Sequence, residues 1–202
     1  ISKITGVPIV HLATAVIFGK KIPELGYEYG LVKPKHHVAV KMPVFSFEKI
    51  YGAEPSLGPE MKSTGEVLGI ANTFPEALLK AFIGAGYYLP RSKRIVMTVN
   101  DNDKQETVSI AERFIKLGYE INSTQGTYEY LTKKGVPALK INKIEEQSPT
   151  ILDFILSGEC DLVVNTPTHS GSHNRDGFII RRNAVETGTP CITSLDTANA
   201  LL

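Results

Sequence analysis

Apolar and polar positions divide the chain into two parts with different patterns. From about residue 93 onward, short apolar runs rich in Val and Ile alternate with amphipathic segments that end at glycines, which indicates buried strands alternating with helices. The predicted strands are 95–99, 119–123, 136–141, 161–164 and 190–193, and the predicted helices are 106–117, 128–134, 149–157, 178–187 and a last one from Asp196. Such strand–helix units, repeated over about 110 residues, predict a parallel sheet covered by helices on both faces.

The part before residue 90 shows no such repeat. A helix is predicted between Pro8 and Gly19, and the apolar run 38–45 is predicted to be an edge strand because it contains a proline. Thr73 is placed to cap a helix that continues to about residue 83. With so few strands, this part is not expected to close a core without additional chain.

Composition and charge exclude several classes of function. The chain has 22 basic and 21 acidic residues, so it lacks the basic excess of a nucleic-acid-binding protein. No run of 18 apolar residues and no secretory signal pattern is present, which predicts a soluble, cytoplasmic protein without membrane contact. Cys160 and Cys191 lie in or beside apolar runs, so we expect buried, reduced thiols, and no His or Cys spacing predicts a metal site.

Polar residues follow the predicted strands at their carboxyl ends, where open parallel sheets bind ligands. The segment from Thr124 to Thr127 suits a phosphate, because Gly126 allows close approach of the backbone and a helix begins there. Lys104 and Lys143, on neighbouring loops, supply cationic partners. Ordinary alternatives exist for each, N-capping for the threonines and a solvated surface for the lysines. Their joint position at one sheet edge favours an anion site.

The sequence also resembles a known family. The string from Gly58 to Gly69, Gly-Pro-Glu-Met-Lys-Ser-Thr-Gly-Glu-Val-x-Gly, otherwise reads as a polar loop, but it resembles the end of the second ATP-grasp unit of the carbamoyl-phosphate synthetase large subunit. The segment 91–202 resembles the methylglyoxal-synthase-like domain that ends this subunit. The marks of that domain are Asn100-Asp101-x-Asp103-Lys104, Thr124-x-Gly126-Thr127, Asn142-Lys143, Asp161 to Thr166, and Arg175 to Arg182.

The resemblance implies an α/β fold with a five-stranded parallel, Rossmann-like sheet, preceded by a truncated α+β piece. Residues 1–90 would be the remnant of the ATP-grasp unit, and 91–202 the allosteric domain. In the family this domain binds nucleotide effectors such as UMP or IMP. Carried over by position, the resemblance assigns the phosphate to Lys104, Thr124, Thr127 and Lys143, and the ribose or base to Asn165 and Thr166.

The resemblance also implies partners and limits. The family's enzyme is an ATP-dependent ligase that joins bicarbonate and glutamine-derived ammonia for arginine and pyrimidine synthesis, with Mg or Mn, and works with a small glutaminase subunit. Its ATP ligands would precede Ile1, so the fragment is expected to lack catalytic residues and cofactors of its own. Partners are then the nucleotide and the remainder of the large subunit, with self-association left open. Met42 stands where ornithine-regulated relatives carry glutamate, which argues against ornithine activation.

Two other functions remain as alternatives. One is a catalytic methylglyoxal synthase, a phosphate-eliminating lyase of the same fold. His173 falls near a histidine of that enzyme, but Ser148 stands where its aspartate base is expected, and a hydroxyl cannot abstract a carbon-bound proton at neutral pH. The other alternative is a docking module with no ligand at all.

Overall fold

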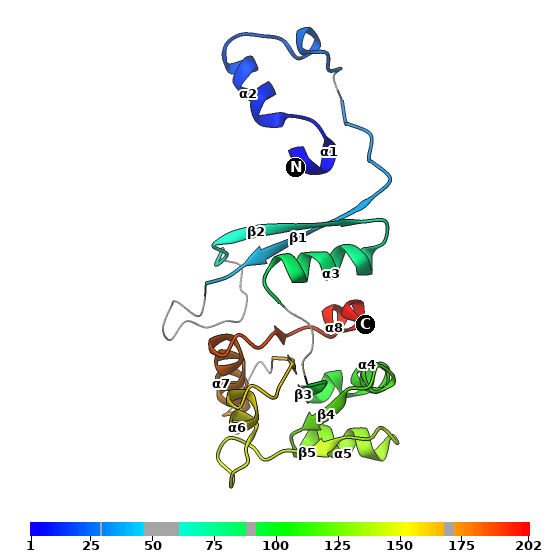
Figure 1. Ribbon diagram of the computed structural model, residues 1–202, viewed down its shortest axis with the longest axis vertical. Coiled ribbons are helices and arrows are strands. Elements are labelled where there is room, and N and C mark those ends of the chain that lie inside the picture. The colour runs from blue at the N-terminus through cyan, green and yellow to red at the C-terminus, as the bar shows by residue number, and fades with distance from the viewer. Residues whose placement is uncertain (29, 47–60, 88–91, 168–171) are drawn as a thin grey trace.

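The computed structural model of the chain describes residues 1–28, 30–46, 61–87, 92–167 and 172–202. Figure 1 shows three parts in a row: an N-terminal helical segment, a hairpin with one helix, and a sheet with its helices. Within the described ranges, no helix is long and apolar enough to cross a membrane. The change in apolar pattern that the sequence shows near residue 93 coincides with the start of the third part, whose first strand begins at Arg94.

The N-terminal segment is made of short helices. They are α1 (Ser2–Thr5), α2 (Ile9–Ile17) and the 3-10 turn η1 (Ile22–Leu25). Pro8 is the N-cap of α2, and Gly19 follows the end of the helix with a φ of 90°, so the predicted helix is confirmed. None of the residues that the structure describes before Gly69 is buried. This segment therefore has no core of its own.

The middle part pairs two strands under one helix. Strand β1 (Val38–Val44) runs antiparallel to β2 (Gly65–Ala71), and α3 (Phe74–Gly84) packs on the pair. The hydroxyl of Thr73 accepts a hydrogen bond from the backbone N–H of Glu76 at 3.4 Å, which confirms the predicted cap. The predicted strand at 38–45 is also confirmed.

The predicted polar loop from 57 to 69 is partly wrong. Residues 57–60 lie outside the described residues, but the loop's last five residues belong to β2, where Gly69 pairs with Val40. Gly69 itself is the first buried position among the residues that the structure describes. A Cβ at this position would overlap the carbonyl oxygen of Ala77 and lie 2.7 Å from the backbone nitrogen of Ala81. The glycine therefore lets the backbone of α3 rest directly on β2.

Replacing Gly69 with alanine is expected to destabilise this packing. The added methyl group meets backbone atoms that cannot rotate away, so the free energy of unfolding should fall by about 1–3 kcal/mol or more. Urea unfolding of Gly69→Ala measures the loss. Gly65→Ala on the same strand is the control, because its Cβ would only reach ordinary contact with Val44 at 3.9 Å. Equal stability of the two variants would contradict this account of the packing.

The third part contains the predicted parallel sheet, which is confirmed. Its strands are β3 (Arg94–Thr98), β4 (Glu120–Ser123), β5 (Leu139–Lys140), β6 (Leu162–Asn165) and β7 (Cys191–Ile192). They lie in the order β5-β4-β3-β6-β7, and every neighbouring pair is parallel. Strand β3, the first strand of this sheet along the chain, is thus the central one. The next two strands, β4 and β5, lie on one side of it, and the last two, β6 and β7, lie on the other.

Helices cover both faces of this sheet. They are α4 (Lys104–Lys116), preceded by the 3-10 turn η3 (Asp101–Asp103), then α5 (Gln125–Lys133), α6 (Ile151–Leu156), α7 (Ser172–Glu186) and α8 (Leu195–Leu201). Alternate residues of β3 enter two different cores: Ile95 and Met97 pack with α4, α5 and α8, whereas Val96 packs with α6 and α7. Each face is therefore closed by its own apolar cluster.

Several boundaries differ from the predictions. The strand predicted over 136–141 is reduced to Leu139–Lys140. The helix predicted to begin at 149 begins at Ile151, and its N-cap is Thr150, whose hydroxyl and backbone N–H form a capping box with Asp153. Helix α7 begins at Ser172 rather than at 178, so Gly177 lies inside the helix.

Both cysteines are free thiols, as the sequence predicts. Cys160 is 5% exposed, and Cys191 is partly buried on β7. Burial raises the pKa of the Cys160 thiol to about 11, and that of the Cys191 thiol to about 12. The folded state therefore keeps these thiols protonated at pH values where the unfolded chain begins to lose their protons.

This difference predicts a loss of stability at alkaline pH. Between pH 9 and pH 11 the unfolded chain binds fewer protons than the folded chain, so the free energy of unfolding should fall, by up to about 1.4 kcal/mol per pH unit for Cys160. Urea unfolding at pH 8, 9 and 10 measures the slope. The Cys160→Ala variant should show a shallower slope, and an unchanged slope in this variant would contradict the prediction.

Candidate functional site

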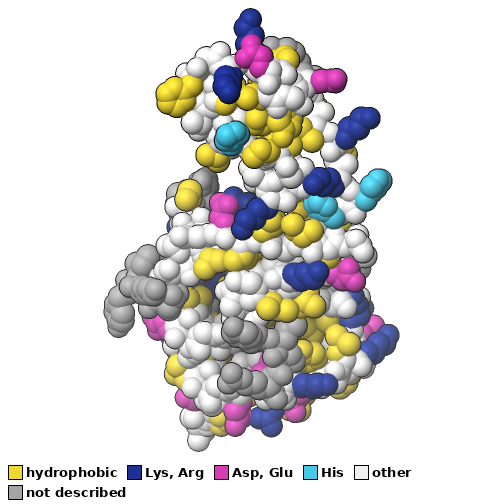
Figure 2. Space-filling view, turned by 45° about the horizontal axis from the view of Figure 1, so that its top comes forward, with side chains coloured by type: hydrophobic (Ala, Val, Ile, Leu, Met, Phe, Trp, Pro, Cys, Tyr) yellow, Lys and Arg dark blue, Asp and Glu magenta, His cyan; other side chains and the backbone are white. Residues whose placement is uncertain are grey.

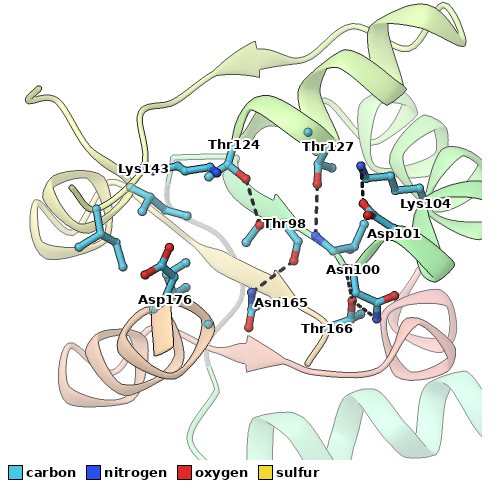
Figure 3. A pocket seen from close by; sticks show the side chains of 16 residues that line it. Thr98, Asn100, Asp101, Lys104, Thr124, Thr127, Lys143, Asn165, Thr166 and Asp176 are labelled. Atoms are coloured by element: carbon cyan, nitrogen blue, oxygen red, sulfur yellow. Dashed lines mark hydrogen bonds and ion pairs between the residues drawn. The ribbon is translucent and has the colours of Figure 1, made fainter. Parts of the chain in front are cut away.

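A cavity of about 200 Å³ opens at the carboxyl ends of the sheet strands (Figure 3). All six residues predicted to bind a ligand line it: Lys104, Thr124, Thr127, Lys143, Asn165 and Thr166. They come from the end of β6 and from the loops or helices that follow β3, β4, β5 and β6. Their role in binding stays a prediction, but the structure places them together in one cavity.

The cavity lies where the direction of the chain connections reverses. Strand β3 continues into α4 on one face of the sheet, and the adjacent β6 continues into α7 on the other face. Such a reversal is the usual ligand position in open parallel sheets. The ends of both strands, Thr98 and Asn165, line the cavity.

The start of α5 supplies the features of an anion site. Thr124 is the N-cap residue by position, yet its hydroxyl makes no capping hydrogen bond and lies 3.2 Å from the hydroxyl of Thr98. The N-capping alternative for this threonine is therefore wrong. The first N–H groups of a helix lack partners within the helix and attract negative charge. Gly126, in this first turn, lines the cavity.

Lys104 brings a positive charge to the same place. Its ammonium nitrogen lies 3.3 Å from the position that a Cβ of Gly126 would occupy, so the cation and the helix terminus are adjacent. Its side chain is only 18% exposed and forms an ion pair with the exposed Asp101, with 2.7 Å between Nζ and Oδ1. Any anion bound here therefore competes with the Asp101 carboxylate.

Thr127 and Lys143 complete the polar wall. Thr127 is buried, and its hydroxyl oxygen accepts a hydrogen bond from the Val99 backbone N–H at 3.3 Å, which leaves the hydroxyl proton for a ligand. Lys143 has no ion-pair partner among the residues that the structure describes, although its backbone N–H donates to Glu146 at 2.9 Å. Its ammonium group is thus available to an anion.

Asn165 and Thr166 are held by other residues. The Asn165 amide nitrogen donates to the Thr98 carbonyl at 3.3 Å, and its oxygen accepts from Arg181 at 2.7 Å. The Thr166 hydroxyl oxygen accepts from the backbone N–H and the side-chain amide of Asn100, at 2.9 and 3.2 Å. Each side chain keeps one hydrogen to donate. Their contribution to a ligand is therefore donation, in fixed directions.

Other polar residues that line the cavity had no role assigned from the sequence, among them Thr98, Asn100 and Asp176. Thr98 and Asn100 flank the end of β3, and Asp176 lies on α7, across the cavity from Lys104 and Thr127 (Figure 3). Asp176 was missed because the helix was predicted to begin two residues later, which left this carboxylate in a loop. Its position within the segment 175–182 was the available signal.

Of the two groups of the enzymatic alternative, the structure describes only the side chain of Ser148. The Ser148 hydroxyl donates to Asp153 at 2.9 Å and does not line the cavity. Asp153 has a lowered pKa, because the Thr150 backbone N–H and two hydroxyls donate to it. The side chain of His173 lies outside the described residues. Those that are described contain no group of three metal-ligating side chains.

Met42 lies away from this cavity. It lines a second cavity of about 280 Å³ between β1 and β7, together with Cys191 and Thr193. A thioether offers no charge to an ammonium group, which is the reason for expecting no response to ornithine. This expectation stays a prediction.

Comparisons with known proteins give consistent family matches. The MGS-like domain model matches residues 106–193. The carbamoyl phosphate synthase large chain of Lachnoclostridium phytofermentans is 57% identical over 202 residues, covering all of this chain and 19% of the relative. Those of Agathobacter rectalis and Clostridium botulinum (strain Langeland) are 58% and 48% identical, with the same coverages. This chain belongs with the MGS-like region of carbamoyl phosphate synthase large chains. It spans about a fifth of the length of these relatives.

Among solved structures, methylglyoxal synthase from Elizabethkingia anophelis is 20% identical, with a TM-score of 0.46. The match covers 55% of this chain and 77% of that protein. The assignment of the fold therefore rests on the sheet order and the family model.

The ion pair at the cavity leads to a prediction for anion binding. Asp101→Asn removes the carboxylate that occupies Lys104, so inorganic phosphate should bind about two- to fivefold more tightly. Ligand-observed NMR titration measures the affinity. Glu112→Gln is the control, because it makes the same change of net charge at an exposed position of α4 that does not line the cavity. Weaker phosphate binding by Asp101→Asn would contradict the competition between the two anions.

Proposed function

We propose that this chain is the regulatory part of a carbamoyl phosphate synthase large chain, and that its cavity binds a nucleotide effector of the UMP or IMP type. The observation that carries the proposal is the position of the Lys104 ammonium beside Gly126 in the first turn of α5. A cation and a helix N-terminus that face the same point favour a phosphate group. The family match supports the same conclusion.

In this proposal the phosphate lies between the two lysines. Lys104 and the backbone N–H groups of α5 contact it from one side, and Lys143 contacts it from the other. The hydroxyls of Thr124 and Thr127 donate to its oxygens. Charge-assisted hydrogen bonds of this kind are roughly twice as strong as neutral ones, so the phosphate supplies much of the affinity.

The sugar and base occupy the remainder of the cavity. Asn165 and Thr166 have one hydrogen each to donate, which suits oxygen or nitrogen acceptors of a nucleoside. The ionised carboxylate of Asp176 accepts hydrogen bonds and cannot donate them, so it suits the hydroxyl groups of a ribose. The site thus provides a phosphate side and a nucleoside side.

The chain is proposed to act as part of a larger protein. Figure 2 shows apolar side chains on the N-terminal segment, where the exposed members include Val10, Ile17 and Phe18, each at least 77% exposed. Exposed apolar surface of this kind marks a contact with another polypeptide. We assign it to the remainder of the large chain, as expected if residues 1–90 are the end of an ATP-grasp unit and 91–202 are the allosteric domain.

The regulatory role follows from this placement. Synthesis of carbamoyl phosphate from bicarbonate, glutamine-derived ammonia and ATP, with Mg or Mn, belongs to the parts of the cytoplasmic enzyme outside this chain, including a small glutaminase subunit. The effector changes that activity only if it binds two states of the enzyme unequally. The cavity described above is the proposed point of that input.

Thermal unfolding with added ligand tests the proposal. UMP or IMP at a hundred times its Kd should stabilise the 202-residue chain by about 2.7 kcal/mol and raise the Tm by roughly 5–10 °C. Lys143→Ala removes a cation of the proposed phosphate site and should abolish the rise, whereas Lys140→Ala, on a lysine that does not line the cavity, should keep it.

Two results would overturn the proposal. One is the absence of any shift with nucleoside monophosphates in the unsubstituted chain, which would favour a pure docking module. The other is production of methylglyoxal from dihydroxyacetone phosphate, which would identify the chain as a lyase. The position of Ser148 away from the cavity leads us to expect no methylglyoxal.

A further inference from the structure

A buried arginine lies directly behind the nucleoside side of the cavity. Arg181, on α7, is 3% exposed and does not line the cavity. Its Nη1 donates a hydrogen bond of 2.7 Å to Oδ1 of Asn165, which is itself 4% exposed and does line the cavity. The arginine can therefore influence a ligand through Asn165 without touching it.

This contact determines which way the Asn165 amide faces. A guanidinium group only donates hydrogen bonds, so it must meet the amide oxygen, and the Thr98 carbonyl only accepts, so it must meet the amide nitrogen. Reversing the amide would place two donors together on one side and two acceptors together on the other. As long as Arg181 is in place, Asn165 presents only an N–H to the cavity.

Gly177 leaves the space that this contact requires. A Cβ at Gly177 would lie 2.9 Å from Nη1 of Arg181 and 3.5 Å from Oδ1 of Asn165. Gly177 lies one turn before Arg181 on α7, within a helix that would favour alanine over glycine. Gly177 therefore provides space for the hydrogen bond between Arg181 and Asn165, and it does not mark the end of a helix.

The guanidinium also acts toward the neighbouring strand. Burial raises the pKa of the Cys191 thiol on β7, and the positive charge of Arg181 opposes that rise. Arg181 thus interacts with a residue at the end of β6, through the Asn165 hydrogen bond, and its charge acts on β7. Its contact with Asn165 is part of a buried layer rather than a surface accident.

We propose that Arg181 is a positioning residue for ligand recognition: it holds the Asn165 amide so that the cavity presents a hydrogen-bond donor to the nucleoside part of the ligand. This inference rests on the proposed nucleotide site and deepens it. The phosphate contacts of Lys104, Thr124, Thr127 and Lys143 do not involve Arg181. Loss of Arg181 should therefore lower the affinity for a nucleotide and leave the affinity for free phosphate unchanged.

The test compares the affinities of UMP, IMP and inorganic phosphate in the full 202-residue chain. Arg181→Met removes the donor, and Gly177→Ala, at a residue that itself lines the cavity, displaces the donor while the charge is retained. Both variants should bind UMP or IMP about tenfold more weakly, as expected for one lost oriented hydrogen bond, and should bind inorganic phosphate as the unsubstituted chain does. If Arg181→Met does not fold, the affinities of Gly177→Ala still test the proposal.

Gly84→Ala is the matched control for a glycine in a helix. Its Cβ would make only an ordinary contact with Val67 at 3.5 Å, so both affinities should stay unchanged. Unchanged nucleotide affinity in Gly177→Ala, or an equal loss of nucleotide and phosphate affinity, would overturn the positioning role. If the unsubstituted chain binds no nucleotide, the proposed function fails, and this inference fails with it.

Discussion

The parallel sheet is buried on both faces, and this constraint determines where polar chemistry can occur. Strands β3 and β6 contribute alternate residues to two apolar clusters, so both faces of the sheet are mainly apolar. Loops at the carboxyl ends are then the places where charged and hydroxyl groups meet without loss of core packing. The connections after β3 and β6 lead to opposite faces of the sheet, which opens a gap in that edge. The cavity with Lys104, Thr127 and Asn165 occupies this gap.

The sequence predicted the strand–helix alternation because each element is marked by local chemistry. Valine- and isoleucine-rich runs gave the strands, and glycines such as Gly118 and Gly135, with φ of 86° and 81°, marked the helix ends. Boundaries were less accurate where tertiary contacts override local preference. A helix was predicted to start at 178, but α7 already includes Gly177, where the side chain of Arg181 occupies the space that a Cβ would need. No local pattern reveals that need.

The candidate site was predicted as a set of residues but not as a network. Strand ends and helix starts indicated which residues meet at the edge, and all six assigned positions line the cavity. The hydrogen bonds that orient them join residues more than 15 positions apart, as with Asn165 and Arg181, or Asn100 and Thr166. Such pairings depend on the packed helices. A single sequence carries no periodic signal for them, which is why Arg181 had no role assigned.

Helix α3 has a consequence for how the parts of the chain move. Its residues Leu78 and Phe82 belong to the same apolar cluster as β3, α4 and α8, although α3 also packs on β1 and β2. The change in sequence pattern near residue 90 is therefore not a break in the core. A packed core transmits displacement rather than absorbing it. A shift of α8 would therefore move α3 and, with it, strands β1 and β2. The five-stranded sheet and the strands that precede it are thus mechanically coupled through α3.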